Sequence, residues 1–427
     1  MRILTAKHVL PITSDPIEDG AVVIDGSNIV AVGKTADVSK QFPDAGTDDF
    51  GDAAILPGFV NCHSHLEITA MRGALDDVEH DFTAWLIKLS RVRESMSDDE
   101  IAEAAYIGAL EGAQAGVTCF GDIGRLGHIG LSGLKRAGLR GVVFQETEFS
   151  PENRAADNDF KKLIGKLERL AAESTDLVCV GLSPHAPYTV SSRLFESIAQ
   201  FSIIERFPLT IHAAESLAEQ ELLTDGGGEF VRVYEKYGVD WESPNCTPIE
   251  YLNRLGVLAA RPILAHCVTV SARDLEIISD TGSKIAHCPK SNAKFAHGAA
   301  PFEAMLDKGV KVGLGSDSVA SNNVCDLLEE ARFAALISRN RTESRRFISA
   351  QEVLRAATLG GAEALGLDDQ IGSLEPGKQA DIALISLQRP AQRPLNDIHT
   401  ALVYSSNARD VMATFVAGKQ IYKRAAY

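Results

Sequence analysis

The middle of the chain alternates short apolar runs with longer stretches in which apolar residues recur at helical spacing. Helical patterns such as residues 101–115 and 194–201 separate the apolar runs. Eight of these runs have the length and composition of buried strands: 54–60, 117–122, 140–149, 177–185, 209–212, 262–266, 284–288 and 311–316. Strand and helix in eightfold alternation predict an α/β fold of the (β/α)₈, TIM-barrel type.

Both ends of the chain have a different pattern, in which apolar and polar residues alternate between turn residues. Residues 20–33 predict a hairpin with its turn near Asp25-Gly26, and residues 377–385 and 411–422 predict strands with tight turns. We therefore expect one small β-sandwich domain built from both termini. The expected domains are 1–54 plus 373–427 for the sandwich and 55–372 for the catalytic barrel.

The net charge excludes some classes of binding partner, and the cysteine content indicates the redox environment of the protein. A formal net charge of −16 argues against nucleic acid or an anionic membrane as a partner, because both attract clustered Lys and Arg. No run approaches the length of a membrane span, and the first residues lack a signal-peptide core. The seven cysteines have no paired spacing, so we expect reduced thiols and a cytoplasmic protein, for which a homo-oligomer remains open. Cys62, Cys267 and Cys288 each adjoin a histidine, and we expect them to be small buried apolar groups.

Polar residues follow several of the predicted strands. His63 and His65 come after the first strand, and residues two apart in a strand share a face, so this pair forms half of a metal site. Chemistry in a (β/α)₈ barrel lies at the carboxyl ends of the strands. A lone histidine there is commonly structural, but a set on one rim predicts a site. The set is His63, His65, His185, His212, His266 and Asp317.

Four members of this set are suitable metal ligands, namely His63, His65, His212 and Asp317. Three neutral nitrogens and one carboxylate suit Zn²⁺ best, and they also suit Fe²⁺ or Mn²⁺. An open coordination position would admit a water, whose pKa a divalent metal lowers. Glu215 lies three residues beyond His212 and is the predicted general acid/base. We expect His266 to orient the attacking water and Asp317 to accept its proton.

The order of these residues resembles the amidohydrolase superfamily over nearly the whole chain. The shared pattern is His63-x-His65, His212-x-x-Glu215, His266 and Asp317. Within the superfamily, the chain is similar to the deaminases of S-adenosylhomocysteine, 5′-methylthioadenosine and aminodeoxyfutalosine. This closer resemblance rests on Ser183-Pro-His-Ala-Pro-Tyr188, His287-Cys-Pro-Lys-Ser-Asn292, the segment 315–323, Leu66-Glu67 and Phe82-x-x-Trp85. Triazine hydrolases and guanine deaminases resemble the same layout.

The resemblance implies a reaction and a metal content. It implies attack at C6 of an adenine ring, protonation of N1 by Glu215, and loss of ammonia to leave hypoxanthine. Some members of the superfamily hold two metals bridged by a modified lysine at about the fourth strand. The third and fourth predicted strand ends of this chain contain no lysine, so we expect one divalent metal per chain.

The resemblance also implies which residues contact the nucleoside. We expect Trp85 and His185 to line the substrate pocket, and a carboxylate after the first strand to accept the ribose hydroxyls. Glu94 resembles the counterpart in the S-adenosylhomocysteine group, and Glu67 resembles that of the aminodeoxyfutalosine group. We expect Glu67 to have this role, because the charged segment around Glu94 is typical of an exposed helix face.

A long connection, residues 216–261, joins the fifth and sixth predicted strands. Connections of this length are commonly lids or binding loops, with a solvated surface excursion as the alternative. We expect this connection, which carries Trp241 and Tyr251, to close over the group carried on the 5′ carbon.

The pattern as a whole predicts a metal-dependent aminohydrolase that deaminates a small-molecule adenine nucleoside. A related hydrolase acting on guanine, another aminated heterocycle or a triazine would share the metal residues and differ only in the pocket. A non-catalytic barrel scaffold is a remote alternative, because a scaffold has no need for the complete set of ligands together with Glu215 and His266.

Overall fold

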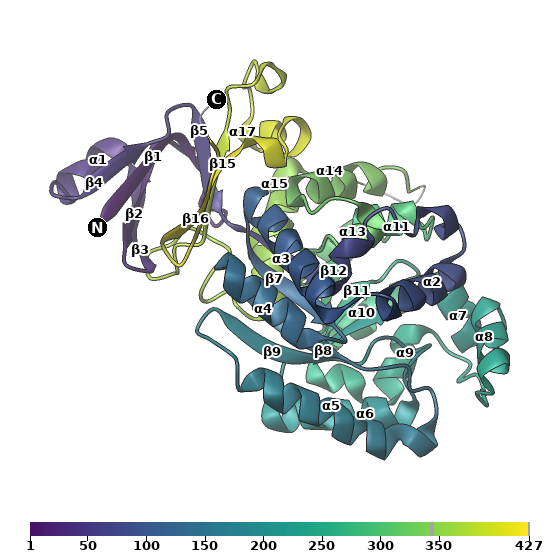
Figure 1. Ribbon diagram of the computed structural model, residues 1–427. Helices are drawn as coiled ribbons and strands as arrows, with labels where there is room; N and C mark the ends of the chain where they lie inside the picture. The colour runs from purple at the N-terminus through teal and green to yellow at the C-terminus, as the bar shows by residue number, and fades with distance from the viewer. Residues whose placement is uncertain (342–345, 426–427) are drawn as a thin grey trace.

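The computed structural model describes residues 1–341 and 346–425. Strands from both ends of the chain pair into one eight-stranded sheet beside a larger body of parallel strands and helices (Figure 1). The strand order in this terminal sheet is β16-β15-β14-β5-β1-β2-β3, and β4 pairs with β1. Its strands are β1 (Arg2–Val9), β2 (Ile17–Asp25), β3 (Asn28–Lys34), β4 (Gly46–Asp49), β5 (Ala53–Pro57), β14 (Ile382–Ser386), β15 (Val411–Val416) and β16 (Lys419–Lys423).

The terminal sheet confirms the strands predicted at both ends. β2 and β3 form the predicted hairpin, in which Asp25 lies opposite Asn28. β15 and β16 form a second hairpin, and β14 pairs antiparallel with β5. Because β5 also pairs with β1, the first and last segments of the chain share one sheet. The second layer of a sandwich stays a prediction.

Eight parallel strands form the centre of the larger body, in two sheets ordered β6-β7-β8-β9 and β10-β11-β12-β13. Single parallel bridges join the two sheets, from Leu182 to Leu209 and from Ser64 to Asp317. The strands are β6 (Phe59–Ser64), β7 (Val117–Gly124), β8 (Arg140–Glu146), β9 (Val178–Ser183), β10 (Thr210–Ala213), β11 (Ile263–His266), β12 (Lys284–His287) and β13 (Val312–Leu314).

The prediction of a single strand over residues 54–60 is wrong. The run contains the end of β5, which belongs to the terminal sheet, and the start of β6, which belongs to the central strands. Gly58 separates the two strands, and a Cβ atom at this position would collide with the side chain of Thr118. The run is continuously apolar because both strands are buried along their whole length.

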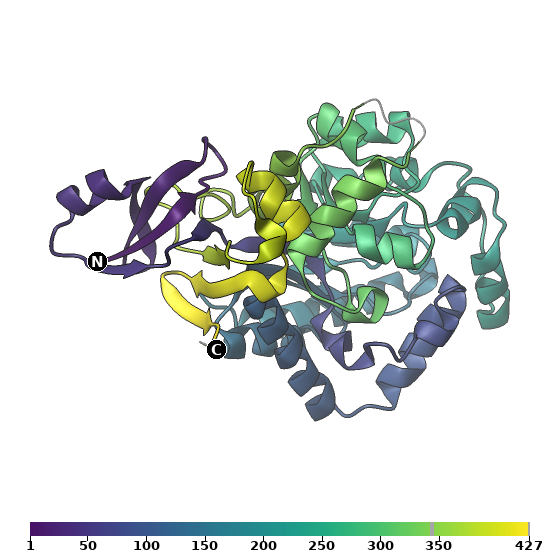
Figure 2. The same ribbon diagram turned by 90° about the horizontal axis from the view of Figure 1, so that it is seen from above.

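Helices surround the central strands (Figures 1 and 2). The predicted helices 101–115 and 194–201 correspond to α3 (Asp98–Gln114) and α6 (Ser192–Glu205). None of the helices in the described part of the chain has the length and apolar character needed to cross a membrane. The helices are α1 (Thr35–Gln41), α2 (Phe82–Glu94), α3 (Asp98–Gln114), α4 (Gly127–Ala137), α5 (Ala156–Ala171), α6 (Ser192–Glu205), α7 (Leu217–Thr224), α8 (Glu229–Tyr237), α9 (Pro248–Arg254), α10 (Ala272–Thr281), α11 (Pro289–Lys294), α12 (Phe302–Asp307), α13 (Val319–Asn322), α14 (Leu327–Ser338), α15 (Ala350–Arg355), α16 (Gly361–Leu365) and α17 (Ile398–Thr400).

Apolar side chains fill the space between the central strands and the helices, and His63, His212, His266 and Asp317 are buried polar residues at the carboxyl ends of the strands. Cys62, Cys267 and Cys288 are buried free thiols, as predicted. Burial raises the pKa of the Cys62 thiol to about 12, so it is neutral at neutral pH. These cysteines therefore pack as small apolar groups beside the histidines.

Candidate active site and metal centre

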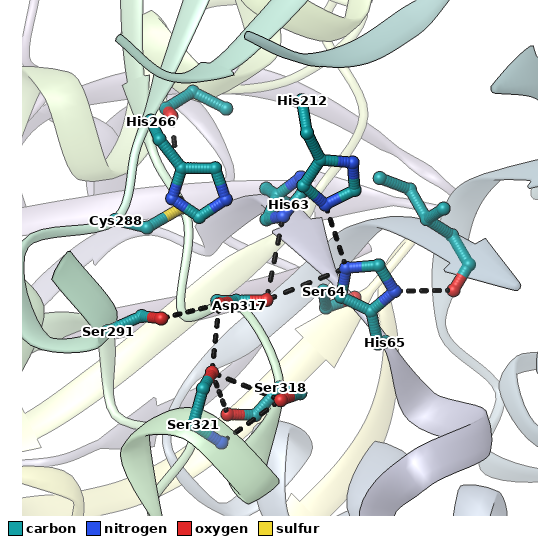
Figure 3. A network of polar contacts seen from close by, with 12 residues as sticks. His63, Ser64, His65, His212, His266, Cys288, Ser291, Asp317, Ser318 and Ser321 are labelled. Carbon is teal, nitrogen blue, oxygen red and sulfur yellow. Dashed lines mark hydrogen bonds and ion pairs between the residues drawn. The ribbon is translucent and has the colours of Figure 1, made fainter. Parts of the chain in front are cut away.

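The predicted metal ligands converge at the carboxyl ends of the central strands. His63 lies in β6 and His212 lies in β10, whereas His65 and Asp317 follow β6 and β13. Figure 3 shows the rings of His63 and His212 above the carboxylate of Asp317 and the ring of His65 beside it. The ring centroid of His63 lies 4.8 Å from that of His212 and 5.1 Å from that of His65.

His65 and His212 face each other with atoms that carry lone pairs. The Nδ1 atom of His65 lies 3.1 Å from the carbonyl oxygen of Ile123, and Nδ1 of His212 lies 3.1 Å from that of His185. A carbonyl oxygen can only accept, so both Nδ1 atoms carry the proton and both Nε2 atoms present lone pairs. The two Nε2 atoms are 3.3 Å apart. Two lone pairs at this separation repel each other unless a cation accepts both.

His63 and Asp317 complete the cluster. His63 is fully buried, and neither of its ring nitrogens has a hydrogen-bond partner in the described chain. Oδ1 of Asp317 lies 3.6 Å from Nε2 of His63 and 3.5 Å from Nε2 of His65. The hydroxyls of Ser291 and Ser321 donate to Oδ2 of Asp317 over 2.6 and 2.8 Å, which leaves Oδ1 turned toward the histidines (Figure 3).

The protonation states of the cluster suit a divalent cation. Burial lowers the pKa of His63 to about 4 and lowers the pKa of His212 well below its ordinary value, so both rings are neutral at pH 7. Burial opposes ionisation of Asp317, but the adjacent His63 and the other histidines hold the pKa of this carboxyl well below its usual range. Three neutral nitrogens and one carboxylate, with unpartnered buried atoms among them, fit a zinc-type site.

Backbone strain gathers at the same strand ends. Ala214, His266 and Asp317 follow or end their strands with positive φ angles of 53°, 71° and 55°. Residues with a Cβ rarely adopt this conformation, and such strain is common at functional sites. The amide of Asp317 donates to the carbonyl oxygen of His63 over 2.9 Å, which ties β13 to β6 at the metal site.

Glu215 lies beside the ligand cluster and is only 3% exposed. Its Oε1 atom is 3.7 Å from Nε2 of His266 and 3.6 Å from Nε2 of His297. Burial opposes ionisation, but the two histidines outweigh it and hold the pKa of Glu215 below its ordinary value. The amide of Glu215 donates to a carboxylate oxygen of Glu219 over 2.8 Å, which fixes the turn after β10. The sequence predicted the position of Glu215 but not the contact with His297.

Two residues of the segment 287–292 orient the predicted catalytic groups. The Nδ1 atom of His266 lies 2.9 Å from Oδ1 of Asn292, so the Nδ1 proton is donated there and Nε2 carries the lone pair. Ser291 donates to Asp317 as described above. The resemblance marked this segment as characteristic but assigned no role to Ser291 or Asn292.

A cavity of about 490 Å³ opens over the cluster. The predicted substrate-contacting residues Glu67, Trp85, Glu94 and His185 all line it, together with the predicted metal and catalytic residues His65, His212, Glu215, His266 and Asp317. Aromatic rings form much of the remaining wall. The ring of Tyr188 stacks on that of Phe230 with centroids 4.3 Å apart. A flat heterocycle fits a wall of this kind.

The two candidate ribose carboxylates differ in their surroundings. Glu67 is buried, and both of its oxygens already accept hydrogen bonds, one from Arg93 over 3.1 Å and one from the amide of Leu126 over 2.8 Å. Glu94 is exposed at the rim of the same cavity. The charged end of α2 that contains Glu94 is therefore only partly a solvated helix face, because Arg93 in the same segment points inward and donates to Glu67.

Sequence reasoning missed Glu146, which ends β8 and lines the cavity. It is 5% exposed, its Oε1 atom has no hydrogen-bond partner in the described residues, and burial raises its pKa. Its ligand atoms group with those of His185 and His212 within 4.8 Å. The signal that could have found Glu146 is its place at the carboxyl end of the third predicted strand, which is the same positional rule that marks the other site residues.

The connection between β10 and β11 contains α7, α8 and α9. Phe230, Tyr234 and Tyr237 of α8 line the cavity, so this connection is more than a surface excursion. Its closure over the group on the 5′ carbon stays a prediction. The connection also carries Trp241 and Tyr251. Neither residue lines the cavity, and Trp241 instead packs behind Tyr234 with ring centroids 5.4 Å apart.

Comparison with known protein families shows to which family the chain belongs. The sequence model of the amidohydrolase family matches residues 54–421. The chain belongs to the amidohydrolase family. This confirms the resemblance seen in the motif order. A further match, to an imidazolonepropionase-like composite domain of bacteria, covers residues 20–45, which contain most of β2, all of β3 and α1.

Individual amidohydrolases match over most of their length. A 5-methylthioadenosine/S-adenosylhomocysteine deaminase of Thermococcus kodakarensis is 33% identical over 399 residues, which are 93% of this chain and 88% of the relative. An adenosine deaminase from Xanthomonas campestris, solved with bound zinc, matches with a TM-score of 0.87 and 30% identity over 98% of this chain and 92% of its own. An atrazine chlorohydrolase from Arthrobacter aurescens, complexed with zinc, matches with a TM-score of 0.83 and 26% identity over 98% and 95%.

Proposed function

We propose that this protein is a metal-dependent hydrolase that deaminates the adenine ring of a modified nucleoside. The substrate belongs to the aminodeoxyfutalosine, 5′-methylthioadenosine or S-adenosylhomocysteine class, and the products are the hypoxanthine nucleoside and ammonia. One observation carries the proposal: Glu215 is a buried, ionised carboxylate beside a four-donor metal cluster, on one wall of a cavity with aromatic sides. The deaminases among the relatives support this substrate class.

The residues that would hold the metal are His63, His65, His212 and Asp317, one cation per chain. When bound there, a divalent metal lowers the pKa of water toward neutrality and acts as a Lewis acid. Zn²⁺ is the expected ion, because the donor set suits it and two solved relatives contain it, and the same donors would accept Fe²⁺ or Mn²⁺.

The protein side chains divide the proton transfers between them. Glu215 takes a proton from the attacking water and delivers it to N1 of the ring while the water oxygen bonds to C6. Before the transfer, the lone pair on Nε2 of His266 accepts a hydrogen bond from the second proton of the water and so orients it, and that proton then passes to Oδ1 of Asp317. The second water proton, held by Asp317, reaches the amino nitrogen through Glu215 as the bond between C6 and this nitrogen breaks. Ammonia leaves, and the oxygen on C6 becomes the carbonyl of hypoxanthine.

The cavity residues would bind the rest of the nucleoside. Burial lowers the pKa of His185 to about 3, so its ring is neutral and can form a single directed hydrogen bond to the purine. Trp85 would pack on the substrate from α2. For the ribose hydroxyls we favour Glu94 over Glu67, in contrast to the expectation from sequence, because both oxygens of Glu67 are already bonded.

We also propose the finer architecture that the sequence predicts. The bridges at Leu182 and Ser64 support closure of the eight central strands into a (β/α)₈ barrel. Two domains would divide the chain, a terminal β-sandwich of 1–54 plus 373–427 and a catalytic barrel of 55–372. The pairing of β5 with β14 supports moving the first boundary to Gly58.

A steady-state substrate screen tests the proposed function. The metal-loaded enzyme is offered adenosine, 5′-methylthioadenosine, S-adenosylhomocysteine and aminodeoxyfutalosine, with adenine, guanine and atrazine for comparison. We expect the adenine absorbance of at least one nucleoside to change with stoichiometric release of ammonia. Faster turnover of guanine or atrazine than of every nucleoside would reject the substrate class and leave the metal site standing.

A further inference from the structure

We infer that His297 is a positioning residue that holds the Glu215 carboxylate in the orientation needed for proton transfer. The inference rests on the proposed function, because Glu215 is taken as the general acid/base of a hydrolytic deamination. His297 lies in the loop after α11, and no strand-end pattern marks it in the sequence.

The contact between the two residues is direct and buried. Nε2 of His297 lies 3.6 Å from Oε1 of Glu215, and this nitrogen is buried with no hydrogen-bond partner in the described residues. The side chain of His297 is 6% exposed and that of Glu215 is 4% exposed. His297 does not line the cavity, whereas Glu215 does. His297 can therefore act on the reaction only through Glu215.

Two aromatic rings fix the orientation of the His297 ring. Phe82 meets it edge to face, with centroids 4.7 Å apart and planes 86° apart, and Phe295 lies 5.3 Å away. The amide of His297 donates to the carbonyl oxygen of Asn292 over 2.9 Å, which anchors the backbone. The ring cannot turn away from Glu215 without displacing these neighbours.

The tautomer of His266 makes His297 the donor that Glu215 needs. His266 also approaches Oε1 of Glu215, at 3.7 Å, but its Nδ1 proton is donated to Asn292, so the neutral ring has no proton on Nε2 to donate and only the protonated ring attracts the carboxylate. Among the described residues, His297 is the other imidazole in an ion-pair contact with this oxygen. A proton on Nε2 of His297 restrains Oε1 and leaves the second carboxylate oxygen for proton transfer.

The charges around Glu215 give the sign of the expected pH effect. Asp317 after β13 and Glu219 on α7 disfavour a charged Glu215, whereas His266 on β11 and His297 favour it. Loss of His297 should therefore raise the pKa of Glu215 and move the acidic limb of kcat to higher pH. Among the described residues, the ionisable groups whose charges act on Glu215 are His185, Tyr188, Glu219, His266, Cys288, His297 and Asp317.

The test compares His297→Phe, which keeps the aromatic packing and loses the donor, with His297→Gln, which keeps a donor. His128→Gln, at an exposed position on α4, is the matched control. We expect His297→Phe to lower kcat about tenfold with KM and metal content unchanged, and its acidic limb to rise by up to about one pH unit. His297→Gln should recover most of the lost kcat. The double variant with Glu215→Gln should be no slower than Glu215→Gln alone, because both changes act on one proton transfer.

Multiplicative losses in the double variant, or equal losses for His297→Phe and His297→Gln, would overturn the inference. A readout without turnover separates this failure from failure of the proposed function. Infrared difference spectra between each protein and its Glu215→Gln form follow the carboxyl group of Glu215 through a pH titration. The carboxyl should ionise at lower pH in the wild type than in His297→Phe, whichever substrate the enzyme uses. An identical titration in both would reject the role of His297 even in an inactive protein.

Discussion

Asp381→Asn should destabilise the protein without altering its chemistry. Asp381 lies just before β14, and its carboxylate accepts from Arg140 at the start of β8, over 3.0 Å from Nε and 3.2 Å from Nη2. Both side chains are 2% exposed, so water cannot replace the lost charge. The pair joins the terminal sheet to the central strands, and Arg140 also donates to Gln379 over 2.8 Å.

The burial of this ion pair sets the size of the effect. Removing one partner of a buried pair costs about 3–5 kcal/mol, because the other charge stays buried and uncompensated. The unfolding entropy of a chain of this length is about 0.9 kcal/mol/K, so the apparent Tm should fall by about 3–6 °C. The exposed pair of Arg136 and Glu103, 2.8 Å apart, provides the control. Glu103→Gln should change the Tm by no more than about 1 °C.

Thermal unfolding followed by circular dichroism measures both variants at one metal concentration. Turnover well below the Tm should match the wild type, because Glu146 at the other end of β8 is the part of this strand that lines the cavity. Equal Tm shifts for Asp381→Asn and Glu103→Gln would refute the assignment of Arg140 and Asp381 as a buried structural link. A fall in kcat with an unchanged Tm would refute it as well.

Three further predictions concern the site. Replacing His212 with Ala should release the metal and abolish turnover, and elemental analysis of the wild type should find about one equivalent per chain; two tightly held equivalents would contradict the single site. Glu215→Gln should keep the metal while kcat falls by about 10² or more, and a near-normal kcat would remove Glu215 from the mechanism. The enzyme should prefer adenine nucleosides to free adenine by about 10² or more in kcat/KM, and Glu94→Gln should erode this preference more than Glu67→Gln, with the reverse order restoring Glu67 as the ribose ligand.

The parallel strands could be predicted from the sequence, because each is buried and is therefore a short run of apolar residues. It failed at the junction of β5 and β6, since two buried strands in succession look like one when only Gly58 divides them. The partners of the terminal strands depend on contacts between residues more than 300 positions apart, such as Ile382 with Pro57, and no local pattern encodes them.

The sequence likewise predicts some residues of the candidate site and misses others. The proposed metal and catalytic residues lie at strand ends or just beyond them, so a positional rule finds them. The sequence did not predict the contact between His297 and Glu215, because this contact depends on how a loop folds back onto Glu215. Glu67 looked available because the pairing with Arg93 joins a turn to a helix and cannot be seen in composition. The aromatic wall from α8 was missed for a similar reason, since amphipathic helices commonly place such rings in an ordinary core.

The shared terminal sheet has a consequence for synthesis of the chain on the ribosome. β5 is made early, but its partner β14 is residues 382–386, which emerge after all eight central strands. Until then β5 presents an unpaired edge to other chains, and the guanidinium of Arg140 lacks its partner Asp381. Nascent chains stalled before residue 381 should therefore need chaperones, and a truncation that removes β14 and β15 should abolish solubility even though it leaves every proposed metal ligand in place.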